Sequence, residues 1–134
     1  MKAIADTGFI VAFKNRADQH HTWAVELARS LDEPLLTCES VLSEAAFHVG
    51  SSEAVLMLVA AGMLEVAFDF RANWESLQDL ASRYSDRHPD LADLCLIRMS
   101  ELHPRYVVVT VDEVFRVYRR NKREVIPLLC PPRK

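Results

Sequence analysis

The sequence feature that most constrains the fold is the run from Tyr106 to Thr110, which contains three consecutive valines. Continuous β-branched runs of this kind are typical of strands buried on both faces of a parallel sheet. Shorter apolar segments precede it, and segments with helical spacing separate them. This alternation predicts an α/β fold, a Rossmann-like three-layer α/β/α sandwich around a central parallel sheet.

The expected elements cover nearly the whole chain, and no repeat or linker interrupts them. A length of 134 residues then predicts a single domain over residues 1–134. Strands are expected at 2–5, 35–37, 64–67, 106–110 and 125–128, the last at a sheet edge because it contains a proline. Helices are expected at 7–13, 18–31, 40–49, 51–61, 71–84, 90–102 and 112–120.

Composition excludes several classes of protein. No apolar run reaches the roughly 20 residues of a membrane span, and the N-terminus lacks a signal-peptide pattern. Cys38, Cys95 and Cys130 are widely spaced in apolar surroundings, so we expect thiols of a cytoplasmic protein rather than disulfides or a zinc site. With only three glycines, the chain has no glycine-rich phosphate loop.

Charge is distributed unevenly along the chain. Residues 1–115 contain nine Lys and Arg against eighteen Asp and Glu, whereas residues 116–134 contain seven against one. A basic segment on an acidic protein suits local contact with phosphate, and a solvated helix face and tail is the alternative interpretation.

Four acidic residues stand at strand ends or within apolar helices. Asp6 directly follows the first expected strand, and Asp112 follows the valine-rich strand by two residues. Both should lie at the carboxyl edge of the sheet, where open α/β folds bind ligands. Glu44 and Asp93 lie in apolar helical segments with no basic residue within three positions. Buried carboxylates need a partner, and a shared divalent cation is one such partner.

Each acid also has a simpler explanation. Asp6 and Asp112 could cap the helices that follow them, and Glu44 could lie on an exposed helix edge. Asp90 and Asp93 have the spacing of a capping box, in which Asp90 is the N-cap. Capping by Asp90 would still allow Asp93 to face the sheet edge. One cluster accounts for all of these acids, whereas the separate explanations require several coincidences.

A cluster of carboxylates favours hard cations. Carboxylate oxygens without His or Cys ligands favour Mg²⁺ or Mn²⁺ over zinc. The five histidines are scattered, and the adjacent pair His20 and His21 would point to different faces of a helix, so no metal role is expected for them. A hard cation can activate water and hold a phosphate oxygen, which supports phosphodiester hydrolysis.

The ordered acidic motifs resemble those of PIN-domain ribonucleases. The resemblance spans nearly the whole chain and implies a PIN-like fold with metal-dependent endoribonuclease activity. In it, Asp6, Glu44, Asp93 and Asp112 hold Mg²⁺ or Mn²⁺ as catalytic residues. The matching segments are Asp6-Thr7-Gly8-Phe9-Ile10, Ser43-Glu44, Leu91-Ala92-Asp93-Leu94 and Val109-Thr110-Val111-Asp112.

The resemblance also implies supporting residues and partners. Thr7, Ser43, Asp90 and Thr110 would surround the ligands and orient them. Members of this size are often VapC-like toxins of type II toxin–antitoxin pairs, commonly homodimers that an antitoxin protein silences. The substrate would be a tRNA, an rRNA or an mRNA.

Contacts with RNA are expected just downstream of Asp112. Arg116, Arg119 and Arg120 are the leading candidates to bind phosphate, followed by Lys122 and Arg123. The two tryptophans, Trp23 and Trp74, stand at helical spacing among apolar residues. They are therefore expected in the core or at a dimer interface rather than as base-stacking platforms.

Two other functions compete with the nuclease hypothesis. One is a non-catalytic PIN-like scaffold that binds RNA or protein, which predicts no binding of Mn²⁺. The other is a receiver-like signalling domain, which also places acids and Mg²⁺ at a parallel sheet edge. The early pair of acids usual in such domains is missing here, so this alternative ranks last.

Overall fold

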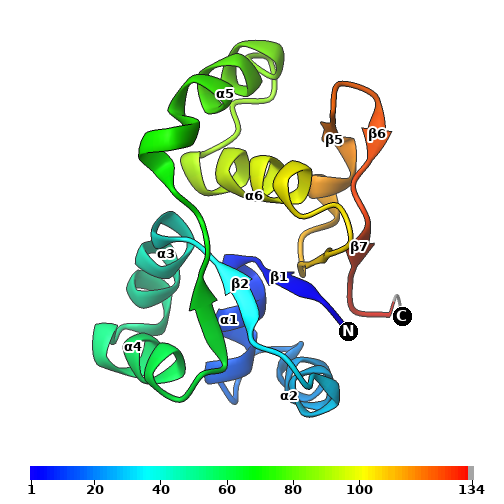
Figure 1. Cartoon of the computed structure of the whole chain (residues 1–134). Coiled ribbons are helices and arrows are strands. Elements are labelled where there is room, and N and C mark those ends of the chain that lie inside the picture. The colour runs from blue at the N-terminus through cyan, green and yellow to red at the C-terminus, as the bar shows by residue number, and fades with distance from the viewer. Residues whose placement is uncertain (133–134) are drawn as a thin grey trace.

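A five-stranded parallel sheet forms the centre of the computed structural model, which describes residues 1–132 (Figure 1). Its strand order is β3-β2-β1-β4-β7, and every pairing is parallel. The predicted Rossmann-like α/β fold is confirmed. The strands are β1 (Ala3–Ala5), β2 (Leu35–Thr37), β3 (Leu64–Val66), β4 (Val107–Val109) and β7 (Leu128–Leu129).

Six helices flank the sheet in two layers. The first four connect β1 to β2 and β2 to β3, and the last two connect β3 back to β4. Parallel crossovers are right-handed, so the reversal of direction after β3 places the last two helices on the opposite face (Figure 1). The helices are α1 (Thr7–Lys14), α2 (His21–Ser30), α3 (Glu39–Val49), α4 (Ser52–Ala60), α5 (Phe70–Arg83) and α6 (Leu91–Leu102).

The core lies on both sides of β1 and β4. All three residues of β1 are buried, and Val108 and Val109 of β4 are fully buried, as the continuous valine run predicts. Helix α6 packs against both strands and is buried over most of its length. The longest helix within residues 1–132, α5, has 14 residues, which is too short to cross a membrane.

The boundary between α3 and α4 follows the expected chemistry. Gly50 ends α3 in the left-handed region at φ 80°, and the Ser51 hydroxyl accepts the Ala54 N–H at 3.0 Å to begin α4. The start of α2 is different. Asp18 Oδ1 accepts the N–H of His20 at 2.8 Å in the preceding turn, so the helix begins three residues later than predicted.

The helix predicted at 112–120 is wrong beyond its first turn. A 3₁₀ helix, η1 (Glu113–Val117), is followed by β5 (Arg119–Arg120), which pairs antiparallel with β6 (Glu124–Val125). The buried side chain of Arg120 holds this hairpin against α6, because its guanidinium donates to the carbonyl oxygen of Ser100 at 2.9 Å.

The strand predicted at 125–128 is divided in two, because the β5–β6 hairpin takes up its beginning. Its first residue belongs to the hairpin, and the chain then joins the sheet as β7, at the edge. Pro127 lies between the two pieces, where its carbonyl oxygen accepts the Val108 N–H at 2.9 Å. Proline fits an edge position because it lacks an N–H to donate.

Candidate functional site

Asp6 lies at the carboxyl end of the central strand β1. Its N–H continues the ladder to the Val109 carbonyl at 3.1 Å, and its side chain is only 9% exposed. Asp6 occupies the N-cap position of α1, but its side chain makes no capping hydrogen bond. Its Oδ2 atom instead accepts a hydrogen bond from the Thr110 hydroxyl. The Thr7 and Gly8 N–H groups at the start of α1 also lower the pKa of this carboxylate, so Asp6 interacts with both Thr110 and the helix start.

Thr110 connects Asp6 to Asp112 through one oxygen atom. The hydroxyl is fully buried, donates to Asp6 and accepts the N–H of Asp112 at 3.0 Å. Asp112 caps η1, because its Oδ1 accepts the Val114 N–H at 2.9 Å, and it lies exposed at the sheet edge. The structure thus places both predicted strand-end acids and their supporting threonine together.

Glu44 reaches the same edge from α3. Its Oε1 atom accepts the Thr7 hydroxyl at 3.0 Å, so the first and second acidic motifs meet through a side-chain hydrogen bond. Thr7 is the first residue of α1, directly after Asp6. The predicted supporting role of Thr7 therefore has a geometric basis.

Asp90 and Asp93 come from the first turn of α6. Asp90 is the N-cap and accepts the Asp93 N–H at 2.8 Å, as the capping-box spacing predicts. Its charge also raises the pKa of both Glu44 and Asp93, which places it among the acids of the site.

The electrostatics show that these acids interact. Burial and then the charges of Asp90, Asp6 and Asp112 together raise the pKa of Asp93 to about 7. Burial likewise raises the pKa of Asp6, which the Thr110 hydrogen bond opposes. Burial and then the charge of Asp90 raise the pKa of Glu44. We call this group the five-carboxylate cluster: Asp6, Glu44, Asp90, Asp93 and Asp112.

No basic side chain neutralises the cluster by a direct ion pair in the part of the chain that the structure describes. The five ion pairs found there all involve other acids. Adjacent carboxylates without a counter-charge repel one another, and a bound cation would relieve that repulsion.

Tyr118, which follows the fourth acidic motif, is a neighbour of the cluster to which the sequence analysis assigned no role in the site. Burial and then the charges of Asp93, Asp90 and Asp112 together raise the pKa of Tyr118 to about 12. Arg87 opposes that increase, so a basic side chain lies on the same side. The sequence pattern placed Tyr118 within an expected helix, and only the 3₁₀ turn after Asp112 directs it back toward the acids.

Two of the predicted site residues have other roles. Ser43 is exposed and lines a separate hollow with Ala46 and Phe47, between α3 and α4. Arg120 is 5% exposed, and its guanidinium also donates to Glu124 at 2.9 Å. The predicted RNA contact of Arg120 is therefore wrong, because its guanidinium is enclosed by the protein.

The other two arginines remain available at the surface. Arg116 is half-exposed and pairs with Glu113 at 3.3 Å. Arg119 is partly exposed, and its Nη1 atom donates to the Arg116 carbonyl at 2.8 Å. Both lie within seven residues of Asp112 along the chain, so phosphate contact stays a prediction for them.

The donor set fits a hard cation in its chemistry, although its geometry is not yet convergent. Within residues 1–132, no three His, Cys, Asp or Glu side chains meet around one point as in a formed metal site. The cluster provides oxygen donors only, which favours Mg²⁺ or Mn²⁺ over zinc.

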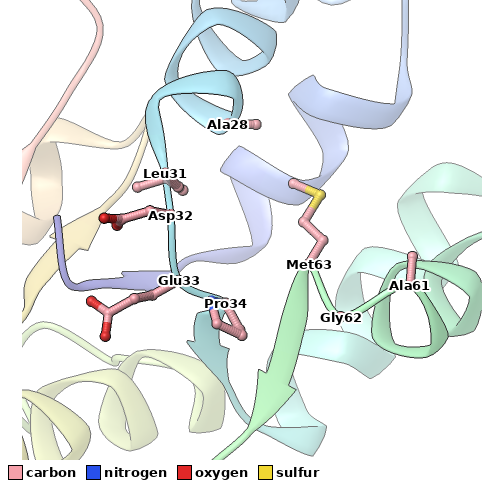
Figure 2. Close-up of a pocket in the computed structure, with 8 residues that line it drawn as sticks. All are labelled: Ala28, Leu31, Asp32, Glu33, Pro34, Ala61, Gly62 and Met63. Carbon is pink, nitrogen blue, oxygen red and sulfur yellow. The ribbon is translucent and has the colours of Figure 1, made fainter.

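A second hollow lies at the opposite edge of the sheet (Figure 2). Pro34 and Met63, in its wall, directly precede β2 and β3, so it is at the amino ends of the strands. Its acids, Asp32 and Glu33, pair with the N-terminal ammonium at 3.4 Å and with Lys2 at 3.3 Å. These acids already have counter-charges, unlike the five-carboxylate cluster.

No family model matches the sequence, and no curated protein matches it. The fold and the site together define the class of the protein as a Rossmann-like α/β protein with an acidic cluster at the carboxyl edge of its sheet.

Proposed function

We propose that the protein is a Mg²⁺- or Mn²⁺-dependent endoribonuclease of the PIN type. The observation that carries the proposal is the five-carboxylate cluster at the carboxyl edge of β1 and β4, without an ion-pair partner among residues 1–132. The likeness of the acidic motifs to those of PIN-domain ribonucleases supports the same assignment.

The residues of the site would have distinct roles. Asp6, Glu44, Asp93 and Asp112 would hold the cation, and Thr110 fixes the orientation of the Asp6 carboxylate. A bound Mg²⁺ or Mn²⁺ supplies a water of lowered pKa and a positive charge opposite a phosphate oxygen. Positioning by hydrogen-bonded neighbours typically matters about 10–100-fold in such sites.

The proposed partners are an RNA substrate, an antitoxin protein and a second copy of the chain. Arg116 and Arg119 are the candidates to contact phosphates of a tRNA, rRNA or mRNA. Exposed apolar side chains on two surfaces support protein partners, as expected for the toxin of a toxin–antitoxin pair that forms homodimers. They are Phe47, Leu56 and Met57 on α3 and α4, and Phe70 and Trp74 on α5.

A second candidate function is a non-catalytic PIN-like scaffold for RNA or protein. The observation in its favour is that the acids of residues 1–132 do not converge as in a formed metal site. Calorimetry separates the two functions, because the scaffold predicts no heat of Mn²⁺ binding at neutral pH, whereas the nuclease predicts saturable binding.

RNA cleavage tests the proposal directly. Purified protein should cut total RNA with Mn²⁺ or Mg²⁺ and not with EDTA, and sequencing of the cleaved ends should identify the cut sites. Asp6→Asn should abolish cutting while leaving the circular dichroism spectrum unchanged. Asp79→Asn is the matched control, because Asp79 is exposed on α5 and is not among the charges that shift the pKa of Asp6, Glu44 or Asp93. Full activity in the Asp6→Asn protein would refute the mechanism.

A further inference from the structure

We propose that a hollow next to the five-carboxylate cluster binds one nucleobase of the RNA, an inference that rests on the proposed function and adds a subsite to it. The hollow has a volume of about 690 Å³. One wall comes from the start of α2 and the turn before it, and the other from the segments after β4 and β7. Its lining residues are Gln19, His20, Trp23, Val111, Glu113, Pro131 and Pro132.

The hollow adjoins the acids through the segment that follows β4. Val111 and Glu113, both in its wall, are the immediate neighbours of Asp112. Val111 also packs against the first turn of α1, where a Cβ atom added to Gly8 would overlap its Cγ2 atom. A strand of RNA whose phosphate lies at the cluster would therefore have an adjacent base within reach of this hollow.

Trp23 provides an aromatic surface that is fixed in place. Its indole ring packs edge-on against the ring of Phe9, with centroids 6.1 Å apart and planes at 84°. Phe9 is fully buried, whereas Trp23 is only partly buried and lines the hollow. Every base has a π-face, so a fixed aromatic ring can accept stacking by any base.

The backbone turn that carries the polar side chains beside Trp23 is also held in position. Asp18 accepts the His20 N–H at 2.8 Å, and His21 Nδ1 lies 2.8 Å from the Ala12 carbonyl oxygen. These bonds fix the turn that carries Gln19 and His20. An amide and an imidazole each offer a donor and an acceptor, the pattern that the edge of a base requires.

The lining favours a base over a phosphate. Among residues 1–132, the lining contains no Lys or Arg, and its acidic member, Glu113, already has Arg116 as an ion-pair partner. Arg116, which pairs with Glu113 at 3.3 Å, lies outside the lining and can contact a phosphate there. The arrangement therefore separates a site for the base from a site for the backbone.

Fluorescence titration tests the nucleobase site without cleavage. The protein carries Asp6→Asn to prevent cutting and Trp74→Phe, so that Trp23 is the only tryptophan left of the two in the chain. The probes are a hexaribonucleotide and six versions of it that each lack one base. We expect quenching of Trp23, and about tenfold weaker binding when one particular base is missing, as loss of one stacked base predicts.

Side-chain variants then test whether this loss of binding affinity arises in the hollow. Gln19→Ala and His20→Ala should each reduce the difference between the intact and the abasic probe severalfold. Gln78→Ala, on α5, is the matched control and should leave the difference unchanged. Equal binding of all seven probes, or differences that Gln19→Ala and His20→Ala do not alter, would overturn the inference.

The result is separable from the test of ribonuclease activity. If the protein cuts RNA but Gln19→Ala and His20→Ala change neither binding nor the sequence preference at the cut sites, the nucleobase site is refuted and the nuclease stands. If base-dependent quenching occurs and no metal ion supports cutting, the ribonuclease proposal fails and the nucleobase site is supported.

Discussion

Thr110 holds two acids of the site through a single hydroxyl group. It donates to Asp6 and accepts the N–H of Asp112 at 3.0 Å, and it has no exposure to solvent. Valine has nearly the same shape without the hydroxyl, whereas serine retains it. The role of Thr110 in positioning Asp6 can therefore be separated from its role in packing.

Thr110→Val should reduce RNA cleavage by about 10–100-fold and the affinity for Mn²⁺ by a similar factor, because the Asp6 carboxylate is no longer oriented. It should also lower the free energy of unfolding by about 1–3 kcal/mol, since the buried Asp6 carboxylate loses its donor and the Asp112 N–H loses its acceptor. Thr110→Ser is the control and should retain most of the activity. Steady-state cleavage rates and urea unfolding measure both effects. Equal losses in the two variants would show that only packing matters.

Asp93 should make the folded protein less stable as the pH rises. Its pKa in the folded state is about 7, above the ordinary aspartate value of 3.8. The folded state therefore binds more protons than the unfolded state between roughly pH 4 and pH 7. The stability contributed by the protonated carboxyl is fully present below about pH 4 and is lost as the pH rises through about 7.

Asp93→Asn removes this dependence. In EDTA at pH 8, the substitution should raise the free energy of unfolding by roughly 2 kcal/mol, after allowance for solvent screening of a partly exposed group. At pH 4.5 the two proteins should have nearly equal stability, because Asp93 is then protonated in the folded state. Urea unfolding at the two pH values gives the comparison. A variant that is less stable than the wild type at pH 8 would contradict the prediction.

At the scale of elements, Gly8 allows α1 to pack closely against the segment after β4. A Cβ atom at position 8 would overlap Val111 Cγ2, and the short, branched valine side chain has little freedom to move. Gly8→Ala should therefore destabilise the protein by about 1–3 kcal/mol, despite the better helix propensity of alanine. Thermal unfolding measures the loss.

The double variant Gly8→Ala with Val111→Ala provides the check. It should recover part of the stability that Gly8→Ala loses, because the overlapping methyl group is gone. Purely additive effects of the two substitutions would mean that the residues do not interact, and the proposed contact would be wrong.

The sequence predicts elements well where periodicity and burial agree. The valine run forms β4, and the glycine and serine between α3 and α4 end one helix and begin the next. Prediction fails after Asp112, because the deciding interaction there is not local. Arg120 bonds to Ser100 and Pro104, residues 20 and 16 positions away, and no periodicity within residues 112–128 indicates those contacts.

In the candidate site, too, the sequence predicts the positions of some residues and not of others. Strand ends place Asp6 and Asp112 correctly, and capping chemistry places Asp90. The position of Tyr118 depends on a 3₁₀ turn, which the sequence pattern did not distinguish from a helix. Within residues 1–132, no hydrogen bond with the acids supports the predicted role of Ser43. Its neighbour Glu44 faces α1, and adjacent helical residues point in different directions.

At the scale of the whole molecule, an acidic protein concentrates unpaired negative charge at one sheet edge and basic residues in the segment after it. Residues 116–123 contain five of the sixteen Lys and Arg of the chain. Four of the five acids of the cluster lie in segments separated by at least 19 residues, so only the fold brings them together. A cation that joins them would therefore connect β1, α3, α6 and the start of η1.

Binding of that cation should be coupled to the release of protons. A carboxyl group must lose its proton to bind a metal ion, and Asp93 has a pKa of about 7. At pH 6 most Asp93 side chains are protonated, so Mn²⁺ binding should release about one proton per cation. At pH 8.5 the group is already ionised, so the release should fall toward zero and the affinity should rise.

Calorimetric titration with Mn²⁺ in two buffers of different ionisation enthalpy measures the number of protons released. Asp93→Asn should abolish the release at pH 6 and weaken binding at both pH values, whereas Asp79→Asn should behave as the wild type. Tight binding at pH 6 without proton release would mean that the cation does not reach Asp93. The cation would then bind only a subset of the cluster that leaves the first turn of α6 outside the metal site.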